Sequence, residues 1–137
     1  RDGLAGAWLA KTKDTDQWLQ VDLGGPCLVS GVATQGRGLP RDGVYDQWVT
    51  AYQLLSSLDG VAWIGQGGLL EGNKDTETPV GHAFDPPFLC RFVRFCPKAW
   101  FEHVCLRVEV YGSPATFAPA LPGRHLIIVT GAAAAAA

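Results

Sequence analysis

Two stretches of the sequence alternate strictly between apolar and polar side chains. In residues 17–23 the two leucines and the valine fall on one side, and in residues 104–111 the valines and Leu106 again share a side. A period of two residues is typical of a strand with one face buried and one face in water. The chain is therefore constrained to an architecture in which sheets bury one face.

More strands are predicted between clusters of glycine and proline. The further candidate strands are residues 28–35, 48–57, 61–64, 80–84 and 89–96. Turns are predicted at residues 24–26, 58–60 and 85–87, and loops at residues 36–43 and 65–78. Short strands at this spacing, with 17 Gly, 9 Pro and only 18% charged residues, favour an antiparallel sandwich or barrel over a helical bundle. We predict an all-β fold with essentially no helix.

The apolar members of these strands form the predicted core. The residues expected to be among the most buried are Leu19, Val21, Val32, Leu54, Val93, Leu106 and Val108.

Length and charge exclude several classes of protein. A chain of 137 residues with 47% hydrophobic side chains suits one globular domain. The formal net charge of −2 gives no overall attraction to phosphate backbones, so no nucleic-acid partner is expected. The longest uncharged apolar run, starting at Leu126, is far shorter than the roughly 20 residues that cross a bilayer. No transmembrane segment is expected in this chain.

Composition changes near the C-terminal end. We assign residues 1–112 to one domain, residues 113–125 to a proline-rich linker, and residues 126–137 to a following segment or an alanine tail. The sequence has no methionine and no signal peptide at its start, so we expect it to be an excerpt of a larger multidomain protein.

The sequence has four cysteines: Cys27, Cys90, Cys96 and Cys105. No two of them form a C-x-x-C motif, so the sequence does not support a structural zinc site. Cys90 and Cys96 lie at opposite ends of one predicted strand and are too far apart to pair with each other. Buried thiols are favoured for most of the four, with at least one disulfide as the alternative.

The chemistry-bearing residues do not assemble into a catalytic motif. The three histidines, His82, His103 and His125, accompany no G-x-S-x-G turn, so no enzyme is expected. The acidic groups at residues 14–16 and 71–77 could hold a structural calcium ion, but they lack an ordered ligand spacing. No other cofactor is expected.

Several motifs, taken together and in order, resemble one known family. The matching stretches are Gly6-Ala7-Trp8, the segment from Asp14 to Gly24 that reads DTDQWLQVDLG, Gly31 to Arg37 that reads GVATQGR, Tyr45 to Thr50, Asp59-Gly60 with Trp63, Gly72-Asn73 with Asp75, Phe84 to Pro87, Arg91 to Pro97 and Leu106 to Gly112. Over residues 6–112 they resemble the discoidin domains, also called coagulation factor 5/8 type C domains.

The resemblance implies a jelly-roll β-sandwich of the galactose-binding-like type, whose loops at one end bind rather than catalyse. Members bind cell-surface or matrix ligands such as glycans, anionic phospholipid or collagen, which implies an extracellular or outer-membrane-face location. The family's usual first strand and loop would precede this chain. Leu9 stands where the family usually has the disulfide partner of Cys105, which implies that Cys105 is a buried, reduced thiol.

The expected contact surface follows from the same resemblance and from the composition of the loop after residue 36. Arg37 matches the arginine that collagen-binding members place on their ligand. The expected ligand-binding residues are Arg37, Leu39, Arg41 and Tyr45, flanked by Asn73, Lys74, His82, Trp100 and His103. Trp100 could instead cap the core, which we favour slightly. Trp8, Trp18, Trp48 and Trp63 are expected to be core residues.

The function predicted is therefore noncatalytic recognition or adhesion. Two alternatives stay open. One is a structural domain packed within a larger filament or an extracellular or ciliary assembly, and the other is an appended sugar-binding module of a larger enzyme.

Overall fold

The structure is a computed structural model that describes residues 7–37 and 46–115. Within those ranges all regular secondary structure is β. The strands are β1 (Trp8–Leu9), β2 (Leu19–Gln35), β3 (Trp48–Ser57), β4 (Ile64–Glu71), β5 (Val80–Phe101) and β6 (Cys105–Pro114). All their pairings are antiparallel. The predicted all-β antiparallel class is confirmed.

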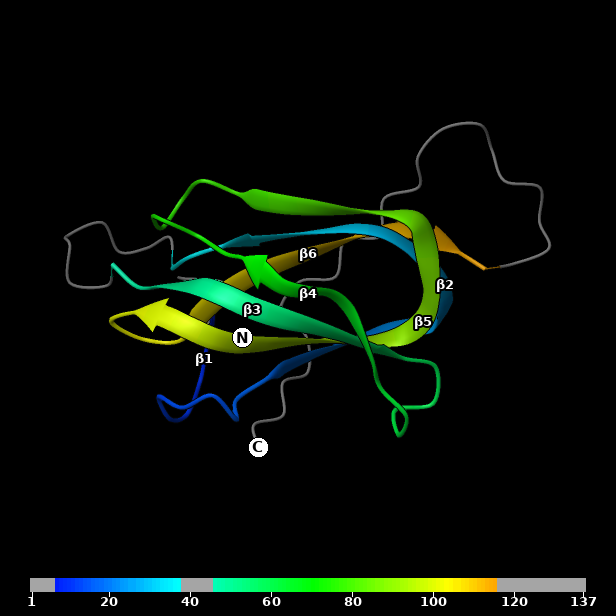
Figure 1. Cartoon of the computed structure of the whole chain (residues 1–137), viewed down its shortest axis with the longest axis horizontal. Helices are drawn as coiled ribbons and strands as arrows, with labels where there is room; N and C mark the ends of the chain where they lie inside the picture. The colour runs from blue at the N-terminus through cyan, green and yellow to red at the C-terminus, as the bar shows by residue number, and fades with distance from the viewer. Residues whose placement is uncertain (1–6, 38–45, 116–137) are drawn as a thin grey trace.

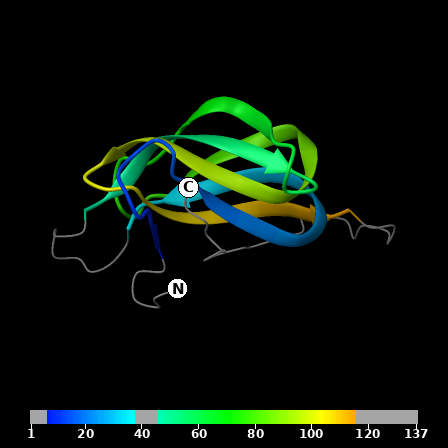
Figure 2. The same ribbon diagram turned by 90° about the horizontal axis from the view of Figure 1, so that it is seen from below.

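The strands are hydrogen-bonded in the order β1-β6-β2-β5-β3-β4, and this sheet folds back on itself as two layers (Figure 1). The long strands β2 and β5 belong to both layers. Residues 19–22 of β2 pair with residues 92–95 of β5, which in turn pairs with β3. Residues 27–35 of β2 lie between the first part of β5 and β6. Figure 2 shows the resulting sandwich, with β3 and β4 on one side and β6 on the other.

The core lies between the two layers and contains the side chains that alternation places on one face. All the predicted core residues are at most 8% exposed: Leu19, Val21, Val32, Leu54, Val93, Leu106 and Val108. Along β6, Leu106, Val108 and Val110 are buried while Arg107 and Glu109 between them are partly exposed. The two-residue alternation of apolar and polar side chains thus predicted the buried face of the strand correctly.

Two predicted strand breaks are bends inside continuous strands. The prediction of a turn at residues 24–26 is wrong, because β2 runs through them with a register shift between Asp22 and Cys27. Gly24 has a φ of 88°, and its N–H donates a hydrogen bond to the Asp22 carboxylate. Pro86 and Pro87 similarly fall at a register shift of β5, where no ladder hydrogen bond is required of them. Irregular positions let both strands pass from one layer to the other.

The prediction of a loop over residues 65–78 is also partly wrong, since residues 64–71 form β4 at the edge of the sheet. Glycine lowers strand propensity, but the main chain of β3 supplies the pairing. Gly67 and Gly68 have φ values of 80° and 69° beside a register shift opposite Gln53 and Leu54. The glycines here make a bulge, not a loop.

Trp18 and Trp63 are not core residues, in contrast to the expectation. Both are half-buried, and their rings flank the Arg94 guanidinium carbon at 3.9 and 4.0 Å. Nε of Arg94 donates to Oε1 of Gln20 at 2.9 Å. The cation is attracted to the faces of both rings, so this stack stabilises the outer surface of the β2–β5 pair.

Trp8 and Trp48 are likewise half-buried. Trp8 packs against the core, and Trp48 stacks on Phe101 with ring centroids 4.5 Å apart. All four cysteines are buried, and the structure forms no disulfide among them. The expected burial of Cys105 is confirmed, and its reduced state stays a prediction.

Candidate functional site

Four loops come together at one end of the sandwich (Figure 1, left). The strand registers require this, because Gln35 at the end of β2 pairs with Arg107 near the start of β6, and Trp48 at the start of β3 pairs with Phe101 at the end of β5. Three of the loops are residues 10–18, 72–79 and 102–104, and the fourth, between β2 and β3, is described only at its two ends, residues 36–37 and 46–47. We call this the loop end.

Asn73 fixes the base of the 72–79 loop from inside the protein. It is 1% exposed, and its side-chain amide donates to the carbonyl oxygens of Thr34 and Thr78 at 2.8 and 3.1 Å. Its main-chain N–H donates to the carbonyl of Val49 at 2.7 Å. Sequence analysis predicted ligand contact for Asn73. Its burial and its hydrogen bonds instead give it a structural role beneath the loops.

Arg107 was missed by the sequence analysis and joins two of the loops. Its Nε donates to the Gly36 carbonyl at 2.6 Å, and its Nη2 donates to the Thr76 carbonyl at 2.7 Å and to Glu77 Oε1 at 3.0 Å. A guanidinium holds several donors in a rigid plane and can therefore serve several acceptors at once. In the sequence Arg107 is only one of the residues on the polar face of an alternating strand, with nothing to distinguish it from Glu109.

Arg37 lies at the start of the 36–47 loop and is half-buried. Its main-chain N–H donates to the Gln47 carbonyl at 3.0 Å, and its Nη1 donates to Gln47 Oε1 at 3.3 Å. Arg37 and Gln47 therefore close the base of this loop. The other predicted members, Leu39, Arg41 and Tyr45, lie outside the described residues.

The remaining predicted side chains are at or near the loop end but are partly engaged by the protein. The His82 Nε2 atom lies 2.7 Å from the Glu71 carbonyl, and the His103 Nδ1 atom lies 3.3 Å from the Val104 carbonyl. Trp100 is half-buried against the core, as expected of a capping ring. Lys74 is exposed and forms an ion pair of 3.3 Å with Glu71.

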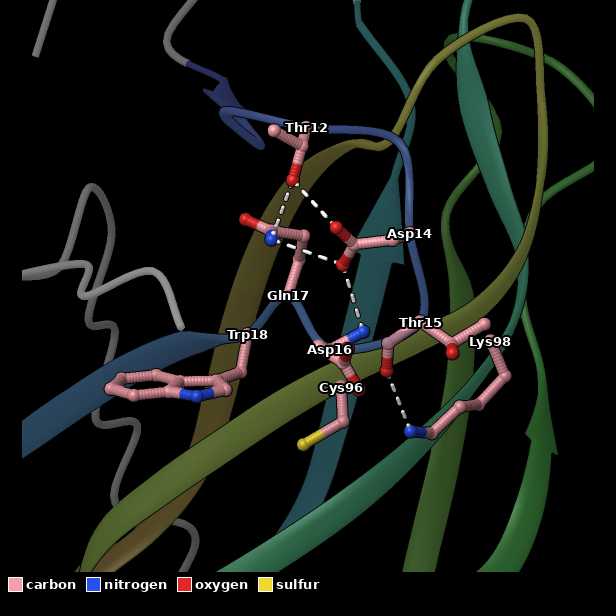
Figure 3. A pocket seen from close by; sticks show the side chains of 8 residues that line it. All are labelled: Thr12, Asp14, Thr15, Asp16, Gln17, Trp18, Cys96 and Lys98. Atoms are coloured by element: carbon pink, nitrogen blue, oxygen red, sulfur yellow. Dashed lines mark hydrogen bonds between the residues drawn. The ribbon is translucent and has the colours of Figure 1, made fainter.

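An open pocket of about 550 Å³ lies beside the 10–18 loop (Figure 3). Its lining residues are Thr12, Asp14, Thr15, Asp16, Gln17, Trp18, Cys96 and Lys98. Lys98 comes from β5, and its Nζ donates to the Thr15 carbonyl at 3.0 Å, which joins the loop to the strand. Sequence analysis noted the acidic residues here only as a weak calcium signal, because nothing local showed that Lys98 would face them.

Hydrogen bonds within this loop order its polar groups. Gln17 is 3% exposed, and its Nε2 donates to Thr12 Oγ1 at 2.8 Å and to Asp14 Oδ1 at 3.1 Å. The Thr12 hydroxyl and the Gln17 amide, with the Asp16 N–H, hold the pKa of the Asp14 carboxyl below its usual value. The buried Gln17 Oε1 has no hydrogen-bond partner among the described residues. The pocket lining thus includes an ionised carboxylate and an ammonium group.

Residues 7–37 and 46–115 contain no group of three or more His, Cys, Asp or Glu side chains placed to hold a metal ion. The same residues form no helix with the length and apolar character needed to cross a membrane.

Comparison with known proteins gives consistent matches. The F5/8 type C domain model matches residues 1–110. Lactadherin of Sus scrofa is 39% identical over 117 residues, which cover 80% of this chain and 28% of lactadherin. Coagulation factor VIII of Sus scrofa is 36% identical over 118 residues, which cover 82% of this chain and 5% of factor VIII. The chain therefore spans only a small part of the length of these relatives.

Solved structures show the same fold. Discoidin II of Dictyostelium discoideum superposes with a TM-score of 0.72 at 31% identity, over 80% of this chain and 42% of that one. A putative chitobiase fragment from Bacteroides thetaiotaomicron gives a TM-score of 0.66 at 18% identity, over 80% of this chain and 70% of that one, and supports the fold alone. From its motifs, its sandwich and these matches, the chain belongs to the F5/8 type C domain family, the discoidin domains.

Proposed function

We propose that this chain is a noncatalytic recognition module that binds a cell-surface or matrix ligand through its loop end, on the extracellular side of the membrane. The observation that carries the proposal is the convergence of four loops on a framework of strands, with Asn73 and Arg107 fixing their bases. Loops held by a rigid scaffold are the usual place for binding residues. Family membership supports the same function.

The chemistry of the loop end suits a polar ligand with hydroxyl or anionic groups. Lys98 and Asp14 line the open pocket. Arg37 lies at the base of the 36–47 loop, where its N–H donates to the Gln47 carbonyl. A guanidinium can form two hydrogen bonds at once to a carboxylate, a phosphate or a pair of hydroxyls. A glycan, a phospholipid headgroup and a collagen-like protein all present such groups.

The histidines support binding rather than catalysis. His82 and His103 each direct a ring nitrogen to a main-chain carbonyl, whereas a general base has to reach the proton of a nucleophile. We propose that binding requires no cofactor. A structural calcium ion near residues 14–16 stays a prediction.

Binding by the full chain to arrays of glycans, to liposomes with and without anionic phospholipid, and to collagens would identify the ligand. Arg37→Ala is expected to weaken that binding by about 1–3 kcal/mol, with only a small fall in melting temperature from the lost Nη1 hydrogen bond to Gln47. The triple variant Arg37→Ala, Leu39→Ser, Arg41→Ala is expected to weaken it further. The matched control is Arg91→Ala, which removes an exposed arginine from the face of β5.

Equal binding by the wild-type protein and the triple variant would place the contact surface elsewhere. Binding by a pocket variant, Lys98→Met, would then show whether the ligand contacts the pocket beside the 10–18 loop instead of the 36–47 loop. Loss of binding in Arg91→Ala alone would contradict the assignment to the loop end altogether.

A further inference from the structure

Cys27 and Cys90 face each other across the antiparallel pair β2–β5. The register makes them direct Cα partners, with Leu28 opposite Leu89 as the next pair. Directly opposed residues of antiparallel strands project from the same face of the sheet. Here that face is the core, because Cys27 is 4% exposed and Cys90 is fully buried, whereas Leu28 and Leu89 are 39% and 46% exposed.

This register satisfies the main geometric requirement of a disulfide. Opposed Cα atoms in antiparallel strands are about 4.5 Å or about 5.5 Å apart, depending on the hydrogen-bonding pattern. Disulfides join Cα atoms roughly 4.4–6.8 Å apart. The separation of β2 and β5 at this pair therefore falls within the range that a disulfide can span.

The strand register places no cysteine opposite either of the other two. Cys96 is opposite Gln53 on β3, and Cys105 is opposite Leu9 on β1. Cys27 also occupies a particular place in the fold, since the register shift between Asp22 and Cys27 is where β2 passes from one layer to the other. A bond at this point would join β2 to β5 where β2 enters its second layer.

We propose that Cys27 and Cys90 are a disulfide-forming pair that cross-links β2 to β5 at the bend of the sandwich. A small disulfide such as oxidised glutathione serves as the oxidant. The Cys27 thiolate attacks it, forming a mixed disulfide and releasing one glutathione thiolate. The Cys90 thiolate then attacks the Cys27 sulfur, forming the protein disulfide and releasing the second. The two protein thiols are oxidised, their two protons pass to the glutathiones, and one glutathione disulfide is reduced.

The surroundings of the pair indicate when the bond forms. The Cys27 thiol donates a weak hydrogen bond to the Gly25 carbonyl at 3.5 Å, inside the bend. Burial, followed by the adjacent Cys27 thiol, raises the pKa of the Cys90 thiol to about 12. The thiolate is the reactive species, so exchange is slow in the folded domain and faster while the bend is still open to solvent. The bond therefore forms during folding in an oxidising compartment, where disulfides persist.

The test refolds the full chain in a glutathione redox buffer and, in parallel, in excess reductant. Peptide mapping without reduction is expected to recover a linked peptide containing Cys27 and Cys90, and the intact mass is expected to fall by about two hydrogens. Because the bond closes a long loop of the unfolded chain, the oxidised form should melt about 10 °C higher than the reduced form.

Three variants keep the proposal falsifiable. Cys27→Ala and Cys90→Ala should each abolish both the linked peptide and the redox dependence of Tm, while Cys96→Ala should retain them. If a single alanine variant fails to fold, mapping of the wild-type chain still decides the matter. Recovery of both residues as free thiols after refolding with oxidised glutathione, or linkage of either to Cys96 or Cys105, would overturn the proposal.

Discussion

At the scale of single residues, the loop end depends on how closely the 72–79 loop approaches β3. The N–H of Gly72 donates to the Thr50 carbonyl at 2.8 Å, and the N–H of Asn73 donates to the Val49 carbonyl at 2.7 Å. A Cβ atom at position 72 would overlap the main-chain oxygen of Val49. This position therefore requires glycine.

Gly72→Ala is accordingly expected to destabilise the domain by about 1–3 kcal/mol, because the backbone of β3 or of the loop has to move. Urea unfolding of the two proteins measures the effect. The control is Gly25→Ala, where an added Cβ meets nothing within 4 Å. Equal unfolding midpoints for the wild type and Gly72→Ala would contradict the close approach.

The Asp75 carboxylate shapes the same loop, and its contribution depends on pH. It accepts hydrogen bonds from the main-chain N–H and the hydroxyl of Thr78, each at 2.7 Å. These bonds hold the pKa of Asp75 below its usual value. A lowered pKa in the folded state means that the stabilisation is present above the unfolded pKa of about 3.9 and is lost as pH falls through the folded value.

Asp75→Asn retains an acceptor but cannot titrate, so its stability should fall less than that of the wild type between about pH 5 and about pH 2. Urea midpoints measured across this range provide the comparison. Asp46→Asn, at an exposed position of another loop, serves as the control. Parallel pH profiles for the wild type and Asp75→Asn would show that the carboxylate does not support the loop.

At the scale of elements, β4 shows how an edge strand can escape detection. Its sequence, IGQGGLLE, contains three glycines and no clear alternation. Only Leu70 is buried, at 8% exposure, while its neighbour Leu69 is 68% exposed. Backbone pairing with β3 holds the strand, and one leucine anchors it to the core.

Leu70→Ala is expected to destabilise the domain by about 2–3 kcal/mol, because it leaves a cavity beneath the edge strand. Leu69→Ala is a matched control that removes the same atoms from an exposed position, and it should change stability by no more than about 0.5 kcal/mol. Thermal or urea unfolding distinguishes the two variants. Similar losses for both would mean that β4 lies in a different register.

At the scale of the whole molecule, the sandwich separates a loop end from a bend. Arg107 connects loops that are far apart in sequence, and the Cys27–Cys90 pair lies at the bend, away from those loops. Removing the Arg107 contacts should therefore loosen the loop end without affecting the bend.

Arg107→Ala is expected to speed hydrogen exchange at the amides of Glu77 and Thr78 by about tenfold, since a charge-assisted hydrogen bond is worth roughly 1.5 kcal/mol or more. Exchange at Val29, in the ladder beyond the bend, should stay unchanged. Arg91→Ala, which removes an exposed ion pair with Asp22, is the control. Uniformly faster exchange throughout Arg107→Ala would indicate a global loss of stability instead.

Local sequence predicted much of the framework. β3 begins and ends at the predicted residues, and the alternation around Leu19 and Leu106 identified core positions that are buried in the structure. The sequence pattern predicted the wrong structure where hydrogen bonding to a neighbouring strand outweighs the turn preference of glycine and proline. This occurs at the bend near Gly24, at the proline pair of β5 and in the glycine-rich β4. The candidate site was harder to predict from the sequence, since Asn73 was assigned to the surface and Arg107 was missed.

The order of the side chains was enough to establish the fold class, the buried face of each long strand and, through the ordered motifs, the family. These properties follow from the side-chain period and from short motifs, which are local. Tertiary structure alone decided that Lys98 faces the 10–18 loop, that Arg107 joins two loops, and that Cys27 lies opposite Cys90. Each of these contacts joins residues distant in the chain, and strand register, which the bends of β2 and β5 set, determines which residues meet.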